Sequence, residues 1–234
     1  MPFRYFGLVP AAGGGTRFGA AASAPKQYAE IDGAPMIRHA VDALAAAREI
    51  ETVFVVLAPG DERFKALDWS GLGGRVEPLY CGGATRSESV LNGLIALAAV
   101  LEGDDWVLVH DAARPCLARQ DLRRLIDEVK DGDAGGILAI PVADTIKRGD
   151  DARGILATES REGLWRAQTP QMFRYAMLLR ALRAAPHVTD ESAAVEAAGF
   201  HPRLVEGSRS NFKVTYAADL ALAALILRSA EEKR

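Results

Sequence analysis

The chain has 234 residues, of which 49% are hydrophobic and 25% charged, and its formal net charge is −3. This composition suits one globular domain over residues 1–234, and the lack of a basic excess excludes a typical nucleic-acid or membrane-surface binder. The most apolar segments, "LNGLIALAAVL" and "LALAALIL", are shorter than the about 20 residues of a membrane span. With no signal-peptide pattern and two cysteines that lack metal-ligand spacing, we expect a cytoplasmic protein with reduced thiols.

Strand-like and helix-like patterns alternate through the first 142 residues. Short apolar runs that predict strands lie at 5–9, 52–58, 105–111 and 135–142. Helical patterns lie between them at 35–47, 89–101 and 120–130. Near-continuous apolar strands separated by helices are typical of a parallel sheet that is covered on both faces. We therefore expect an α/β fold with three layers (α/β/α) and a mostly parallel sheet.

The alternation breaks near residue 143. Two short β-like runs flank a Gly-Asp-Asp turn there, which predicts a protruding β-arm over residues 140–162. The arm is either a dimerisation element or a simple surface hairpin. Helices resume at about 174–184, 190–198 and 216–232, with Thr189 as a candidate N-cap of the second.

Four polar or glycine-rich clusters follow the predicted strands. They cover residues 10–26, 82–89, 111–114 and 209–215. In open α/β sheets, ligands bind at the carboxyl ends of the strands. The clusters therefore predict one composite site.

The glycine-rich loop "LVPAAGGGTRFG" fits neither of two common phosphate-binding patterns. A GxGxxG fingerprint from Gly13 would need glycine where Phe18 stands, and a Walker A loop would need Lys-Ser/Thr after Gly19. The loop still offers backbone N–H groups for a phosphate, and Arg17 and Lys26 add positive charge. The alternative is a plain tight turn with two solvated cations.

Seven motifs together resemble the 2-C-methyl-D-erythritol 4-phosphate cytidylyltransferase family. They are spread from Pro10 to Thr215: "PAAGGGTRFG", "PKQY", "GGATRSESV", "VHDAARP", "SREGLWRAQTPQ", "TDE" and "NFKVT". The resemblance implies a Rossmann-like nucleotidyltransferase fold and a homodimer joined through the β-arms. It also implies transfer of a cytidylyl group from CTP to 2-C-methyl-D-erythritol 4-phosphate, with Mg²⁺. The products would be 4-diphosphocytidyl-2-C-methyl-D-erythritol and pyrophosphate, in the non-mevalonate route to isoprenoid precursors.

The resemblance also implies roles for individual residues on the CTP side. Arg17 and Lys26 would stabilise the transition state, and Lys213 would bind the same phosphates or position the attacking phosphate. The other nucleotide contacts would be Pro10, Ala11, Ala12, Gly13, Gly15, Gly82, Gly83, Ser89, Asp111 and Ala112. Glycines 82 and 83 also suit a turn, with a helix N-cap at Ser87 or Ser89. Asp111 could meet Mg²⁺, which prefers oxygen ligands, or instead the ribose or the next turn.

On the acceptor side, the implied contacts are Arg114, Thr145, Arg161, Thr169 and Thr189. Thr145 and Arg161 would reach across the dimer, and Arg161 is also counted among the catalytic residues because its fork of donors matches a phosphate. Arg114 could instead form a structural ion pair, and capping alone would explain Thr189. The attacking phosphate oxygen is already ionised at neutral pH, so no general base is needed, and His110 is expected to be a packed residue at a strand end.

One position departs from the family. The residue after "GG" is often acidic there, whereas here it is Ala84. Base contacts through the backbone would survive this change. Two other functions stay open: a ribitol-5-phosphate cytidylyltransferase, which shares the nucleotide half, and a non-catalytic nucleotide-binding regulator.

Overall fold

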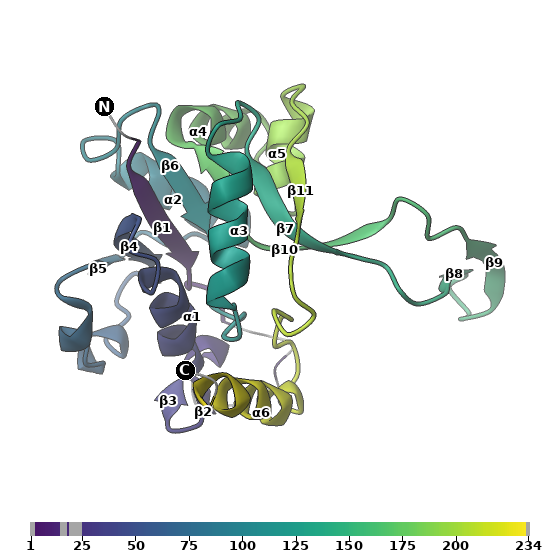
Figure 1. Ribbon diagram of the computed structural model, residues 1–234, viewed down its shortest axis with the longest axis horizontal. Coiled ribbons are helices and arrows are strands. Elements are labelled where there is room, and N and C mark those ends of the chain that lie inside the picture. The colour runs from purple at the N-terminus through teal and green to yellow at the C-terminus, as the bar shows by residue number, and fades with distance from the viewer. Residues whose placement is uncertain (1–2, 15–17, 19–24, 233–234) are drawn as a thin grey trace.

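The computed structural model describes residues 3–14, 18 and 25–232. Its strands are β1 (Tyr5–Pro10), β2 (Glu30–Ile31), β3 (Ala34–Pro35), β4 (Ile50–Val56), β5 (Val76–Leu79), β6 (Trp106–Val109), β7 (Gly136–Pro141), β8 (Ile146–Gly149), β9 (Ile155–Glu159), β10 (Trp165–Arg174) and β11 (Arg203–Glu206). Its α-helices are α1 (Met36–Ala45), α2 (Arg86–Ala96), α3 (Arg119–Val129), α4 (Tyr175–Ala184), α5 (Glu191–Ala197) and α6 (Asp219–Glu231). Figure 1 shows their arrangement. Within these described residues, no helix is long and apolar enough to cross a membrane.

The central sheet has seven strands in the order β11-β7-β10-β6-β1-β4-β5. β10 runs antiparallel to both of its neighbours, β6 and β7, and every other pairing is parallel. The expectation of a mostly parallel sheet is therefore confirmed. The antiparallel strand follows from the arm, because β7 leaves the sheet into the arm and β10 returns directly beside it.

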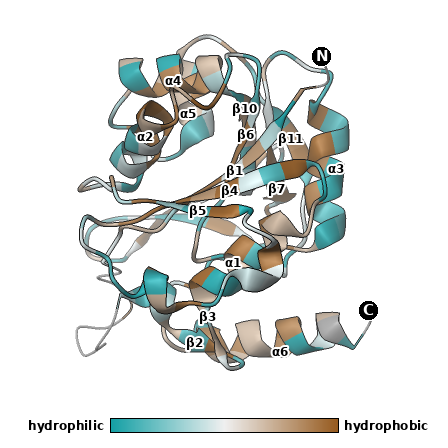
Figure 2. Cartoon of the chain, turned by 90° about the vertical axis from the view of Figure 1, so that its left-hand side faces the viewer, coloured by the Kyte–Doolittle hydropathy of each residue, from teal (hydrophilic) through white to brown (hydrophobic). Residues whose placement is uncertain are grey.

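Helices cover both faces of this sheet, as the apolar strands predict. One face packs against α2, α4 and α5 through residues such as Leu94 and Leu178. The other packs against α1 and α3 through residues such as Val41 and Leu125. Figure 2 shows the strands largely in the hydrophobic colour between these layers. α6 lies outside them, against β2, and shares a smaller core with Ile31 and Met36.

The strand register brings the carboxyl ends of neighbouring strands to one edge. Leu8 of β1 pairs with Val109 of β6, and Pro10 pairs with Val56 of β4. The part of β10 that pairs with β6 begins at the same edge, because β10 runs the other way and places Gln171 opposite Val109. The segments that follow β1, β4, β5 and β6 therefore meet there.

The predicted arm is present as the antiparallel pair β8–β9, which stands away from the sheet (Figure 1). The turn between them spans the predicted Gly-Asp-Asp stretch, and Arg153 takes a positive φ of 67° there. Two apolar side chains of β9, Ile155 and Leu156, are 69% and 63% exposed. These two side chains are therefore available for contact with another protein.

Several details differ from the sequence predictions. β5 and β11 were not predicted, because β5 contains a proline and a glutamate and three of the four residues of β11 are exposed. The N-caps are also different. Thr85 caps α2, in place of Ser87 or Ser89, and Asp190 caps α5, in place of Thr189. In both cases the cap lies at the point where the chain leaves the extended conformation.

Candidate active site at the carboxyl edge of the sheet

A pocket of about 190 Å³ lies at this edge, and all four predicted clusters contribute to it. Its lining residues are Pro10, Ala11, Ala12, Gly13, Lys26, Gln27, Gly83, Ala84, Thr85, Arg86, Ser89, Asp111, Ala112, Ala113 and Lys213. The prediction of one composite site is confirmed in this respect. A larger groove, of about 1270 Å³, is lined by residues of α1, α3 and α6 and by none of the predicted site residues.

The described part of the glycine-rich loop is fixed against the sheet. The backbone N–H of Ala11 donates to the carbonyl of Val56 (2.8 Å), and the Gln27 side-chain amide donates to the carbonyl of Ala11 (2.6 Å). These bonds hold the segment Pro10–Gly13 along the pocket wall. Gly15 and Arg17 lie outside the described residues.

Gly82 lets the second loop approach the first. A Cβ at this position would lie 2.2 Å from the Cβ of Ala12 and 2.8 Å from the carbonyl oxygen of Leu57. Its N–H donates to that same carbonyl at 2.8 Å. Any larger residue would therefore push the two loops apart, and with them the two walls of the pocket.

The start of α2 holds the next part of the wall. The Thr85 hydroxyl accepts from the N–H of Glu88 (3.1 Å), while the Glu88 carboxylate accepts from the N–H of Ala84 (2.8 Å). This is close to a capping box, in which side chains at the two ends of the first turn exchange hydrogen bonds. The Ser89 hydroxyl donates to the carbonyl of Thr85 and accepts from the N–H of Gly83. Ser89, which was predicted to contact the nucleotide, thus fixes the loop between Gly83 and Thr85.

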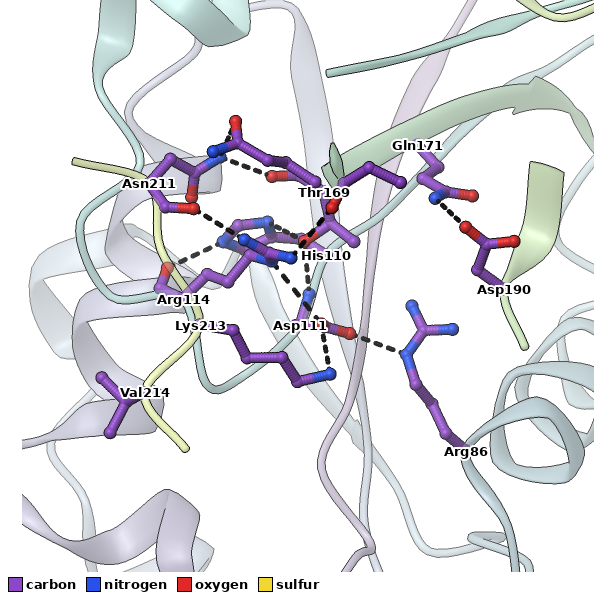
Figure 3. Close-up of polar contacts among 12 residues, drawn as sticks. Arg86, His110, Asp111, Arg114, Thr169, Gln171, Asp190, Asn211, Lys213 and Val214 are labelled. Carbon is purple, nitrogen blue, oxygen red and sulfur yellow. Dashed lines mark hydrogen bonds and ion pairs between the residues drawn. The ribbon is translucent and has the colours of Figure 1, made fainter. Parts of the chain in front are cut away.

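Asp111 follows β6 and is the sole carboxylate among the described residues that line the pocket. Three cationic side chains surround it (Figure 3). Its Oδ1 is 2.7 Å from Nε of Arg86, and its Oδ2 is 2.8 Å from Nζ of Lys213 and 3.6 Å from Nε of Arg114. Burial opposes ionisation of Asp111, but Arg86, Lys213 and Arg114 outweigh it and hold its pKa far below the ordinary value.

His110 is fully buried and bonded through both ring nitrogens. Its Nε2 lies 3.1 Å from the Arg114 carbonyl, to which it can only donate, so Nδ1 accepts from the Thr169 hydroxyl at 2.9 Å. The same hydroxyl accepts from the N–H of Asp111 at 3.0 Å. Burial lowers the pKa of His110 to about 4, so the ring is neutral at pH 7. His110 is thus a packed strand-end residue, as expected, and Thr169 orients it.

Arg114 is largely buried and already has protein partners. It donates to the carbonyls of Asn211 (2.7 Å) and Ala167 (3.3 Å), in addition to its ion pair with Asp111. Asn211 in turn donates to the carbonyl of Thr169 at 2.8 Å. These contacts attach the segment before Lys213 to β10 and to the end of β6. The ion-pair alternative for Arg114 is therefore present in the structure.

Lys26 and Lys213 both line the pocket, although one lies near the start of the chain and the other near its end. The ammonium of Lys26 donates to the carbonyl of Val214 at 2.7 Å. This bond crosses 188 positions of sequence and places Lys26 beside the backbone of the "NFKVT" segment. The Lys213 side chain lines the pocket and is 39% exposed, and its ammonium lies against the buried Asp111 carboxylate.

Two further residues of the site were not predicted. Arg86, the first residue of α2, donates to Asp111 and also to Glu191, the first residue of α5. Glu191 is completely buried. The available signals were the arginine that directly follows a cap residue in "GGATRSES" and the acidic residue that ends "TDE". Neither signal indicates that the two side chains meet.

The remaining predicted acceptor residues do not line the pocket of this chain. Thr145 and Arg161 lie at the two sides of the arm and are exposed, and the Arg161 guanidinium bonds the Ala143 carbonyl. Thr189 is exposed just before α5. Thr169 is 4% exposed and directs its hydroxyl at His110 and Asp111. A single chain thus leaves the acceptor side of the pocket without these groups.

Comparison with known proteins agrees with this geometry. The model of the family described as 2-C-methyl-D-erythritol 4-phosphate cytidylyltransferase (IspD) matches residues 6–229. A protein of that name from Dechloromonas aromatica is 57% identical over 229 residues, which cover 98% of this chain and 99% of the relative. One from Aromatoleum aromaticum is 55% identical over 224 residues, which cover 96% and 95%.

Solved structures give the same result. A crystal structure of a 4-diphosphocytidyl-2C-methyl-D-erythritol synthase superposes with a TM-score of 0.85 at 37% identity, covering 97% of this chain and 99% of that one. The 2-C-methyl-D-erythritol 4-phosphate cytidylyltransferase of Thermus thermophilus superposes with a TM-score of 0.78 at 30% identity, covering 97% and 100%. The likeness extends over almost the whole fold in both cases.

Proposed function

This chain belongs to the 2-C-methyl-D-erythritol 4-phosphate cytidylyltransferase family, and on that premise we propose how its residues perform the reaction. It is a nucleotidyltransferase with the Rossmann-like fold of that family. It transfers the cytidylyl group of CTP to 2-C-methyl-D-erythritol 4-phosphate in isoprenoid biosynthesis, and pyrophosphate is the leaving group. The observation that carries the assignment of residues is the cluster of cations around Asp111 in a pocket walled by glycine-rich loops.

The nucleotide lies along the wall built by Pro10–Gly13 and by the loop that contains Gly82 and Gly83. Close packing of these two loops leaves backbone groups, more than side chains, to meet ribose and base. Ser89 and Ala112 complete this wall. Because the wall is mainly backbone, Ala84 in place of an acidic residue does not prevent recognition of the base.

The triphosphate lies toward Lys26 and Lys213, and Arg17 joins them from the part of the loop outside the described residues. Charge builds up on the phosphoryl oxygens as the bond to pyrophosphate breaks, and fixed cations stabilise that charge. Lys26 is held by the Val214 carbonyl, and Lys213 by Asp111, so both ammonium groups are in place before substrate arrives. Such preorganisation lowers the cost of reaching the transition state.

The acceptor needs orientation but no deprotonation. Its attacking phosphate oxygen is ionised at neutral pH, and the one histidine near the pocket is neutral with both ring nitrogens bonded inside the protein. Lys213 lines the side of the pocket where this phosphate approaches, and the buried Arg114 lies behind it, in an ion pair with Asp111. The reaction therefore depends on positioning and charge.

We assign the remaining acceptor contacts to a partner subunit. Thr145 and Arg161 project from the arm and do not line the pocket of their own chain. Ile155 and Leu156, exposed on the same arm, provide apolar surface for a homodimer. In that dimer the arm of one subunit brings Thr145 and Arg161 to the pocket of the other.

The residues fit a divalent cation that arrives with the nucleotide. Among the described residues, no cluster of three His, Cys, Asp or Glu side chains could form a protein cage for a metal. Mg²⁺ does not need one, since it keeps several waters and commonly binds one or two carboxylates together with substrate phosphates. Asp111, the carboxylate of the described pocket lining, would meet the water shell of such an ion beside the cationic side chains that already contact it. When bound, the ion would neutralise charge on the triphosphate.

An omission assay tests this function. Pyrophosphate release is measured with CTP, MgCl₂ and 2-C-methyl-D-erythritol 4-phosphate together, and with each left out in turn. We expect release in the complete mixture alone. Release without the acceptor would indicate simple hydrolysis of CTP. If EDTA left the release unchanged, the reaction would not depend on a divalent cation.

A further inference from the structure

Arg86 connects the pocket carboxylate to a second carboxylate that takes no part in the proposed chemistry. Its Nε donates to Oδ1 of Asp111 at 2.7 Å. Its two terminal nitrogens donate to the two oxygens of Glu191, at 2.7 and 2.9 Å. One guanidinium thus joins the starts of α2 and α5 to the end of β6.

The buried position of Glu191 requires an explanation. An ionised carboxylate that is fully removed from water is costly unless a charged, hydrogen-bonded partner compensates it. Arg86 is that partner, and the two parallel bonds fix the plane of its guanidinium. The remaining N–H group, on Nε, then points toward Asp111. A lysine could not bond both carboxylates with the same geometry.

Glu191 is itself held in place by β10. The Gln171 side chain accepts from the N–H of Ser192 (2.8 Å) and donates to Asp190 (2.9 Å). Asp190 caps the helix by accepting from the N–H of Ala193 at 3.1 Å. Figure 3 shows Gln171 and Asp190 beside the group around Asp111. Since Gln171 lies opposite Val109, the last residue of β6, the first turn of α5 is fixed relative to the strand that Asp111 follows.

We propose that Arg86 and Glu191 are positioning residues that act on the reaction through Asp111. Glu191 fixes Arg86, and Arg86 fixes Oδ1 of Asp111, so that Oδ2 faces the ammonium of Lys213 at 2.8 Å. Lys213 is thereby held toward the phosphates before they bind. This inference rests on the proposed function, because it assigns to Lys213 a role in turnover.

A double-mutant cycle tests the connection. Glu191→Gln keeps the shape of the side chain and removes its charge, and Asp111→Asn removes the charge that holds Lys213. Groups that orient a functional side chain commonly contribute about 10- to 100-fold to activity, so we expect Glu191→Gln to lower kcat by about that factor. The Kd for CTP, measured by calorimetry, should change by less than a few-fold. In the Asp111→Asn background, Glu191→Gln should cause little further loss, because coupled residues are not additive.

Two variants serve as controls. Glu196→Gln changes an exposed glutamate on the same helix and should match the wild type in kcat and melting temperature. Arg86→Lys keeps the positive charge but cannot bond both carboxylates at once. It should lower kcat and show the same lack of additivity with Asp111→Asn. It also provides the test if Glu191→Gln does not fold.

Some results would overturn this inference and leave the proposed function intact. If the wild type transfers cytidylyl groups but Glu191→Gln and Arg86→Lys keep full kcat, the two residues do not position Asp111. The same conclusion holds if either substitution lowers kcat by the same factor in the Asp111→Asn background as in the wild type. Absence of transfer by the wild-type enzyme would instead remove the function itself.

Discussion

The ammonium of Lys213 lies 2.8 Å from Oδ2 of Asp111, although the two residues belong to segments on opposite sides of the arm in sequence. Asp111 follows the buried strand β6 and is surrounded by positive charge, so it stays ionised and keeps Lys213 in the pocket. The cation that we propose to meet the phosphates is therefore positioned by a carboxylate. This relationship makes the function of the site sensitive to charge as well as to shape.

Lys26 should matter more to turnover than to CTP binding. Removing one preorganised donor to developing charge commonly costs about 10²- to 10³-fold in rate, so we expect Lys26→Ala to lower kcat by that order. The Kd for CTP should rise only modestly, because the charge that Lys26 meets develops in the transition state. Steady-state kinetics and calorimetry measure the two quantities. Lys65→Ala, at an exposed lysine outside the pocket, is the control, and full turnover by Lys26→Ala would contradict the assignment.

Arg114 should contribute to stability as well as to activity. Its bonds to the Asn211 and Ala167 carbonyls are largely buried, and loss of hydrogen bonds to a charged group costs about 2–3 kcal/mol. We therefore expect Arg114→Ala to lower the free energy of unfolding by that amount in urea denaturation. A variant with unchanged stability and a raised KM for the acceptor alone would show that Arg114 serves substrate only.

The in-trans role of the arm can be tested by mixing two inactive variants. Lys213→Ala and Arg161→Ala are co-expressed with different tags, and the mixed dimers are compared with each parent. If the arm serves the partner's pocket, every mixed dimer has one intact site. Random mixing of a two-fold symmetric dimer then returns about a quarter of the wild-type rate. No recovery in purified mixed dimers would place Arg161 in its own subunit's site, and a monomer in sedimentation equilibrium would exclude the arrangement.

His110 should make the protein less stable in mild acid. Its pKa is about 4 in the folded protein against about 6.5 in an unfolded chain, so the unfolded state binds more protons between these values. The contribution of His110 is complete above about pH 6.5 and is lost as pH falls toward 4. Between pH 7.5 and 5 we expect a loss of about 2 kcal/mol that His110→Gln does not show. Parallel curves for the two proteins in urea denaturation would contradict this.

The sequence predicts most of the sheet and the place of the site, for a physical reason. Apolar runs such as residues 105–111 can be buried only in a covered sheet, and their polar ends must then meet at one edge. The strand β11 could not be predicted from an apolar run, because it lies at the edge of the sheet and three of its four residues are exposed.

The contacts within the site are harder to predict. Arg86 and Glu191 are 105 positions apart, and their meeting depends on how α2 and α5 pack on one face of the sheet. Thr169 and His110 are likewise brought together only by the antiparallel return of β10. The arm residues Thr145 and Arg161 could be placed on the arm from sequence, whereas the site that we propose for them involves a second subunit.

The most direct test of the proposed function is a comparison of two acceptors with the purified enzyme. Pyrophosphate release is measured with CTP and Mg²⁺ in the presence of either 2-C-methyl-D-erythritol 4-phosphate or ribitol 5-phosphate, at matched concentrations. The proposed function predicts rapid release with the first acceptor, formation of the product in which cytidine diphosphate is joined to that polyol, and little release with the second. Equal or faster release with ribitol 5-phosphate, or none with either, would contradict it.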